Sequence, residues 1–251
     1  TGFAYDVKGD LIKVTDALGS QTQFAYTPAF NLLGSVTDAL GHTTGYTYDT
    51  RGNLSSITDA GGNQTQMSYD SHGNLVGTTN ALGHTSNFEY DSYGQLVKTT
   101  DALLNITALG YDAVGNNVAV TDPKGATTGF SYDALNRLTA IHFADGTSVA
   151  HAYDAFGNRL SITDQKSNTT ANAYDVYERL TRTTDALGGV TGYTYDKNGN
   201  MTALTDANGH TTNYIYDANG RLLSETTPLG HTTSYSYDAT GNLVSKTDAN
   251  S

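Results

Sequence analysis

The chain has 251 residues, a formal net charge of -12, 18 tyrosines and no cysteine. This acidic balance opposes phosphate backbones, so nucleic-acid binding through clustered Lys and Arg is not expected. No apolar stretch approaches the roughly 20 residues that a membrane-spanning helix needs, and without cysteine both reducing and oxidising compartments stay open.

A tyrosine recurs at a fixed spacing along the chain. From Tyr48 it returns every 21 residues, at Tyr69, Tyr90, Tyr111, Tyr132, Tyr153, Tyr174, Tyr195, Tyr216 and Tyr237. Tyr5 and Tyr26 precede these, and the step from Tyr26 to Tyr48 is 22 residues, which indicates one inserted residue that we place within 33–36. A period of this length defines a tandem array. Because its character never changes, we predict one array of about twelve repeats over residues 1–251.

Each repeat contains two Asp-x-x-Gly units about ten residues apart, and the first follows the tyrosine directly. The first unit has the same form in many repeats, for example Tyr48-Asp49-x-x-Gly52, Tyr69-Asp70-x-x-Gly73 and Tyr216-Asp217-x-x-Gly220. In a type I turn the Asp side chain accepts backbone N–H groups further on, and Gly in the fourth position takes a left-handed conformation without steric cost. Each unit is therefore predicted to reverse the chain.

Segments of about six residues, such as 53–58 and 63–69, lie between the turns. They are rich in Thr, Tyr, Leu and Ile with a period of two, which predicts strands. Thr44, Tyr46 and Tyr48 then share one face of a sheet, which predicts an aromatic ladder on that face.

About 24 such strands predict an all-β fold: tandem 21-residue hairpins that form a spiralling antiparallel ribbon, because long open sheets twist and curl. The alternative is a parallel β-solenoid with one coil per repeat. It would stack the first-turn aspartates about 4.8 Å apart, whereas the hairpin ribbon separates them by about 10 Å, near one Debye length. The charge spacing favours the ribbon.

Several repeats depart from the turn pattern. Thr27, Pro28 and Phe30 stand in the first-turn positions of the second repeat, beside the inserted residue, and predict a distorted turn at 27–34. Other residues occupy a turn-glycine position at Leu104, Asn136, Ser167 and Glu178. Asn accepts left-handed geometry, whereas Glu does so poorly.

The string Tyr-Asp-x-x-Gly-Asn/Arg-Leu, as in residues 216–222, with the following Thr-Asp-x-x-Gly-x-x-Thr-x-Tyr-x-Tyr pattern, closely resembles the YD repeats of the Rhs family. The resemblance covers essentially the whole chain. This family includes bacterial Rhs polymorphic toxins, shell components of Tc insecticidal toxin complexes, wall-associated YD-repeat proteins and teneurins. The resemblance implies β-hairpins wound into a hollow shell that, in the bacterial toxins, encloses a C-terminal toxin.

On this resemblance we expect a secreted or cell-surface bacterial shell segment that encapsulates a toxin or other cargo and performs no catalysis. Asp122-Pro123-Lys124-Gly125 looks like the family's Asp-Pro processing motif but occupies an ordinary second turn. Thr1 and Ser251 both fall inside a repeat, so we expect a fragment of a longer chain. Its open strand edges would pair with flanking YD repeats, or with copies of itself in a filament.

Three other kinds of site can be weighed on the sequence. An extracellular adhesive array could stack sugar rings on Tyr46, Tyr193, Tyr214 and Tyr235, although the same residues suit packing within the sheet. His42, His84, His210 and His231 follow second-turn glycines, but no Cys or clustered Glu completes a metal site. Asp49 and Asp59 lie roughly 20 Å apart along a strand, too far for a glycosidase pair. We expect no metal, no cofactor and no catalytic residue.

Overall fold

The computed structural model describes residues 1–249, which contain 24 β-strands and no helix. The strands are β1 (Gly2–Tyr5), β2 (Leu11–Thr15), β3 (Gln21–Tyr26), β4 (Leu33–Thr37), β5 (Thr43–Tyr48), β6 (Leu54–Thr58), β7 (Gln64–Tyr69), β8 (Leu75–Thr79), β9 (Thr85–Tyr90), β10 (Leu96–Thr100), β11 (Ile106–Tyr111), β12 (Asn117–Thr121), β13 (Thr127–Tyr132), β14 (Leu138–His142), β15 (Ser148–Tyr153), β16 (Arg159–Thr163), β17 (Thr169–Tyr174), β18 (Leu180–Thr184), β19 (Val190–Tyr195), β20 (Met201–Thr205), β21 (Thr211–Tyr216), β22 (Leu222–Thr226), β23 (Thr232–Tyr237) and β24 (Leu243–Thr247). The all-β prediction is confirmed.

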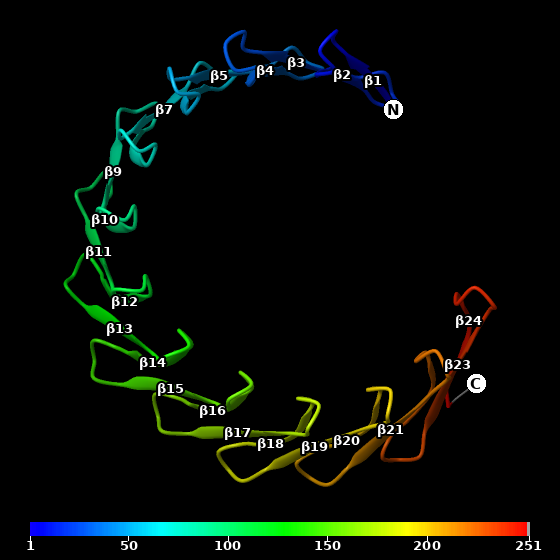
Figure 1. Ribbon diagram of the computed structural model, residues 1–251. Coiled ribbons are helices and arrows are strands. Elements are labelled where there is room, and N and C mark those ends of the chain that lie inside the picture. Colours follow the sequence, from blue (N-terminus) through cyan, green and yellow to red (C-terminus); the bar gives the residue numbers. More distant parts are fainter. Residues whose placement is uncertain (250–251) are drawn as a thin grey trace. The chain divides into compact units, whose positions relative to one another are not determined.

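The chain divides into two compact units, residues 1–127 and the residues from 128 onward. In the first unit β1 to β12 form a meander in which every strand pairs antiparallel with the next. In the second unit β13 to β24 do the same. Within each unit the strands follow one another in a single layer (Figure 1). The antiparallel hairpins are confirmed, and the parallel solenoid is excluded.

Most turns are built around an aspartate side chain. Asp49 Oδ1 accepts the N–H groups of Arg51 at 2.8 Å and Asn53 at 2.9 Å. Gly52 donates its N–H to the Asp49 carbonyl at 3.1 Å and has φ 88°. This is a type I turn followed by a left-handed residue, a common three-residue hairpin loop. One carboxylate oxygen thus satisfies two backbone donors in this turn.

The same geometry recurs in the other repeats. Asp70 Oδ1 and Asp217 Oδ1 each accept two N–H groups at 2.8 to 2.9 Å, and Gly73 and Gly220 have φ 91° and 77°. Asn80 replaces Asp in one second turn and accepts the same two N–H groups at 3.0 Å. A neutral side-chain oxygen can therefore replace the carboxylate, and the turn at Phe143 keeps the same backbone hydrogen bonds with no side-chain oxygen at that position.

A β-bulge follows the first turn of every hairpin within each unit. In β6, Leu54 pairs with Tyr48 and Ser56 pairs with Thr47, so Ser55 has no partner across the ladder. The extra residue brings Leu54 and Ile57, three apart in sequence, onto the face that carries the tyrosines of β5. The sequence analysis missed this bulge, and the signal was an apolar residue at both of these positions.

The two faces of the sheet differ in chemistry, and neither one covers a core. Aromatic and aliphatic side chains such as Tyr46 and Ile57 are half-buried on one face, where the predicted aromatic ladder lies. The opposite face carries small and polar side chains such as Thr47 and Ser56. Within residues 1–249 no hydrophobic side chain is buried, and the one buried polar side chain is Ser56, which is 5% exposed.

The second repeat has a larger first turn. Thr27 donates its N–H to Leu32 O at 2.7 Å, Asn31 donates to Thr27 O at 3.1 Å, and Asn31 takes the left-handed conformation with φ 53°. The distorted turn is confirmed for 27–32. The insertion lies in this loop and not within 33–36, so its predicted place was wrong. A loop absorbs an extra residue without changing the register of β3 and β4, whereas a strand does not.

Other residues adopt the left-handed conformation where Gly is missing. Leu104, Asn136, Ser167 and Glu178 have φ between 60° and 66°. A left-handed conformation costs a residue with a Cβ roughly 1 to 2 kcal/mol. This cost is smallest for Asn. The hydrogen bonds of the turn therefore hold these residues in a strained geometry.

Replacing Glu178 with Gly should raise the free energy of unfolding by about 1 kcal/mol, because the left-handed strain is removed. The matched change Asn136→Gly should give a smaller gain, since Asn tolerates this region. Urea unfolding followed by circular dichroism measures both. An equal effect of the two substitutions would contradict the strain argument.

Candidate functional site at the first-turn edge

Neighbouring hairpins separate toward the Tyr-Asp turns, which we call the first-turn edge. Between β6 and β7 the ladder covers three residue pairs at the other end, from Ser56 with Gln66 to Thr58 with Gln64. Backbone hydrogen bonds therefore do not join Leu54 to the end of β7 at Tyr69. Side chains must connect the repeats at this edge.

The repeat tyrosine makes the first of these connections. Tyr69 donates its hydroxyl to the carbonyl of Leu54, 15 residues earlier, at 3.0 Å. The same bond, at 2.8 to 3.1 Å, is made by Tyr26, Tyr48, Tyr111, Tyr174, Tyr195 and Tyr237. The sequence analysis assigned this residue to packing alone. That the position is always Tyr and never Phe was the signal for a role of the hydroxyl.

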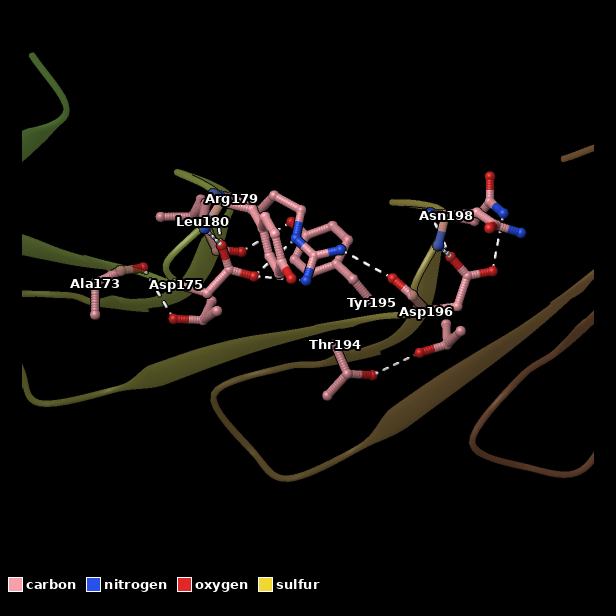
Figure 2. A network of polar contacts seen from close by, with 12 residues as sticks. Ala173, Asp175, Arg179, Leu180, Thr194, Tyr195, Asp196 and Asn198 are labelled. Atoms are coloured by element: carbon pink, nitrogen blue, oxygen red, sulfur yellow. Dashed lines mark hydrogen bonds and ion pairs between the residues drawn. The ribbon is translucent and has the colours of Figure 1, made fainter. Parts of the chain in front are cut away.

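An arginine makes the second connection, shown for Arg179 in Figure 2. Its Nε donates to Asp175 Oδ2 in its own turn at 2.7 Å, and its Nη1 donates to the carbonyl of Asp196 in the next turn at 2.9 Å. Its guanidinium carbon lies 4.7 Å from the ring centre of Tyr195 and 5.2 Å from that of Tyr177. One side chain thus joins two consecutive turns by charge-assisted hydrogen bonds and cation–π contacts.

Arg137 and Arg221 repeat this arrangement. Their Nε atoms lie 2.7 and 2.6 Å from the Oδ2 atoms of Asp133 and Asp217, and both guanidinium carbons lie 4.9 Å from the ring centre of the next repeat tyrosine. Hydrogen bonds from Arg179 hold the pKa of the Asp175 carboxyl below its ordinary value. The ionised carboxylate is therefore the form that the turn stabilises.

At Asn74 and Asn158, which hold the same position, the side-chain amide bonds within its own turn. Asn74 Nδ2 and Asn158 Nδ2 donate at 3.0 Å to the Oδ2 atoms of Asp70 and Asp154, each within its own turn. Open grooves lie beside both residues, toward the next repeat. A guanidinium thus fills the space at Arg137, Arg179 and Arg221, whereas a groove lies beside Asn74 and Asn158. In a further repeat the connection comes from Arg51, two residues before Asn53, whose Nη1 donates to the carbonyls of Asp70 at 3.0 Å and Ser71 at 2.7 Å in the next turn.

The four candidate sugar-stacking tyrosines lie on the strand face and not at this edge. Tyr46, Tyr193, Tyr214 and Tyr235 are half-exposed. They pair across the sheet with Ile57, Leu204, Glu225 and Lys246. Burial, with Glu225 nearby, raises the pKa of Tyr214. Their role in carbohydrate binding stays a prediction.

The histidines after the second-turn glycines lie at the opposite edge. His42 Nδ1 is 2.9 Å from Asp38 Oδ2 and His210 Nδ1 is 3.1 Å from Asp206 Oδ2, each within one exposed turn. In the part of the chain that the structure describes, no three metal-ligating side chains come together. No helix within 1–249 is long and apolar enough to cross a membrane.

The acidic residues that were considered as catalytic candidates accept backbone hydrogen bonds within their own turns. Asp59 Oδ1 accepts the N–H groups of Gly61 and Asn63 at 2.8 and 2.9 Å, as Asp49 does in the first turn. Asp122 Oδ1 accepts those of Lys124 and Ala126 at 2.9 Å. The Asp122-Pro123 pair thus sits in a regular second turn, as the sequence indicated.

Arg179→Ala should lower the free energy of unfolding by about 1 to 3 kcal/mol, because charge-assisted hydrogen bonds and a cation–π contact are lost. Lys197→Ala is the matched control, since Lys197 is an exposed turn residue of the next repeat. Urea midpoints of the two variants give the comparison. Equal effects would show that Arg179 acts only through its net charge.

Comparisons with known proteins agree with this geometry. A family model described as RHS Repeat matches residues 5–35, 31–64, 69–103, 111–148, 134–171, 174–211 and 216–251. None of the curated proteins matches the chain significantly.

Several solved structures are similar to the chain at low sequence identity. The crystal structure of TcdB2-TccC3-TEV has 19% identity and a TM-score of 0.55, and the alignment covers 98% of this chain and 18% of that one. The TcdB2-TccC3-Cdc42 crystal structure has 19% identity and a TM-score of 0.49 over the same shares. The Photorhabdus luminescens Tc holotoxin pore, with a mutated TccC3, has 18% identity and a TM-score of 0.49, again over 98% and 18%. This chain thus spans 18% of the length of those chains. Since RHS Repeat matches cover most of its residues, the chain belongs to the RHS repeat family.

Proposed function

We propose that this chain is a wall segment of a larger Rhs-type shell, secreted or displayed at a bacterial cell surface, which encloses a C-terminal toxin or other cargo. The observation that carries the proposal is the single-layer sheet, which has two chemically different faces and, within residues 1–249, no buried hydrophobic side chain. A sheet of this kind suits a partition between two compartments, since both faces are available to contents or solvent.

The contacts at the first-turn edge support the same role. A wall must keep a fixed spacing between hairpins without a second layer to hold them. Tyrosine hydroxyls and the arginine contacts provide that spacing at the edge where backbone pairing stops. The outermost strands would continue the same pairing with flanking YD repeats, because an unpaired strand edge invites another strand.

We further propose that the segment does no chemistry itself. The carboxylates of Asp49 and Asp59 each accept two backbone N–H groups in separate turns, which is a structural task. Any catalytic activity of the complete protein would then belong to the enclosed cargo or to other segments.

Limited proteolysis of the full-length polypeptide that carries these repeats tests enclosure. The segment C-terminal to the array should resist protease while the shell is folded and should be cut rapidly after the shell is unfolded in urea. A matched sample of that segment expressed alone controls for its intrinsic resistance. Equal cleavage rates in the intact protein and the isolated segment would reject the proposal.

A second candidate is carbohydrate binding, favoured by the equivalent, half-exposed places of Tyr193, Tyr214 and Tyr235 in β19, β21 and β23. Aromatic rings in a row can stack on successive sugars. The chain should then bind glycans on an array, and replacing Tyr46, Tyr193, Tyr214 and Tyr235 with Leu should abolish the signal. Binding that survives these substitutions, or no binding by the native chain, would remove this candidate.

A further inference from the structure

The space between two first turns can bind a guanidinium group, as the arginines of the chain show. At Arg137 the guanidinium meets three groups: Asp133 Oδ2 at 2.7 Å, the Asp154 carbonyl at 2.7 Å and the ring of Tyr153 at 4.9 Å. The Asp154 carbonyl also accepts the N–H of Gly157 at 3.3 Å, so it serves its own turn and the arginine together. These groups form a guanidinium-binding site that the chain fills by itself.

The gap between the Asp91 and Asp112 turns has the same groups but no arginine. Gln95 stands where Arg137 stands in its repeat, and a groove of about 530 Å³ lies between the turns. Tyr111 lines this groove, and its hydroxyl donates to Leu96 O at 3.0 Å. The Asp112 carbonyl accepts the N–H of Gly115 at 3.2 Å, as Asp154 does for its own glycine. The groups that would bind a guanidinium are thus present in this groove, but the chain supplies no arginine to it.

Asp91 is the group that distinguishes this groove from its neighbours. Its Oδ1 accepts the N–H groups of Tyr93 and Gln95 at 2.8 and 2.9 Å, whereas its Oδ2 has no hydrogen-bond partner among the described residues. In the grooves beside Asn74 and Asn158, that second oxygen is already bound by the Asn amide. Gln95 lies toward Gly115 instead, since its Nε2 is 3.2 Å from the place of a Cβ on that glycine.

We propose that this groove binds the side chain of an arginine presented by a partner polypeptide. The incoming guanidinium would lie over the Tyr111 ring and donate to Asp91 Oδ2 and to the Asp112 carbonyl, as Arg137 does within the chain. The ring of Tyr93, 87% exposed at the tip of the Asp91 turn, lines the same groove and offers contact to the aliphatic stem.

Three properties favour arginine over other occupants. The net charge of -12 attracts a cationic segment. The planar guanidinium can donate to two acceptors while it stacks on a ring, which the ammonium of lysine cannot reproduce. The equivalent spaces at Tyr153, Tyr195 and Tyr237 are each occupied by an arginine of the chain itself.

The test titrates the intact chain with the capped tripeptide Gly-Arg-Gly and follows the ring resonances of Tyr93 and Tyr111 by NMR. Because one exposed ion pair and one cation–π contact are weak, we expect a dissociation constant of about 1 to 10 mM. The capped peptide Gly-Lys-Gly should bind at least about fivefold more weakly, and Gly-Gln-Gly should not shift either ring.

Two reciprocal variants make the test specific. Gln95→Arg should fill the groove from within and abolish the Tyr111 shift, while the fold is retained because three repeats carry Arg at this position. Arg137→Gln should open a new groove and add a peptide-induced shift at Tyr153. Unchanged peptide binding by the Gln95→Arg variant, or no shift of Tyr111 in the native chain, would overturn the proposal.

Discussion

The architecture depends on chain reversal without a core. Within residues 1–249 no hydrophobic side chain is buried, so the usual dominant source of folding free energy is reduced to half-buried pairs on one face. Each hairpin must then be specified locally. In most turns an aspartate oxygen that accepts two N–H groups does this, and at Asp175 it holds even Glu178 in a left-handed conformation. In this fold the hydrogen bonds of the turns specify the chain path, whereas in globular domains the packing of a hydrophobic core does so.

Contacts between repeats follow from where the backbone ladder stops. Because the bulge takes one residue out of register and the ladder between hairpins ends early, the first-turn edge would open without side chains across it. The tyrosine hydroxyl spans this space with one neutral hydrogen bond, and Arg137, Arg179 and Arg221 span it with charge. In the second unit arginine alternates with Asn along this edge, and a groove lies beside Asn158 between the filled spaces at Arg137 and Arg179. Repeats with the same backbone structure can therefore present different surface sites.

The residues that build the hairpins are therefore different from the residue that determines the surface between two first turns. The proposed wall needs uniform spacing, to which the Tyr of every repeat and the Asp of nearly every first turn contribute, while the residue five positions after the tyrosine differs between repeats. In the repeat that begins at Tyr90, Gln95 leaves a carboxylate oxygen without a partner, beside a tyrosine ring. A structural array and a binding site can thus coexist in one segment, since the groups that join repeats in one place can receive a ligand in another.

The sequence by itself determined the strands, the two turns of each repeat and the antiparallel course, because these follow from short-range rules: Asp and Gly set the dihedral angles of a corner, and alternation sets the faces. It also located the irregular turn at Thr27, since Phe30 stands where a regular turn has Gly. Tertiary structure alone decided the bulge at Ser55, the position of the inserted residue before Leu33, and the hydroxyl and guanidinium contacts between repeats. Each of these depends on the register between paired strands, and register results from pairing rather than from the preference of single residues.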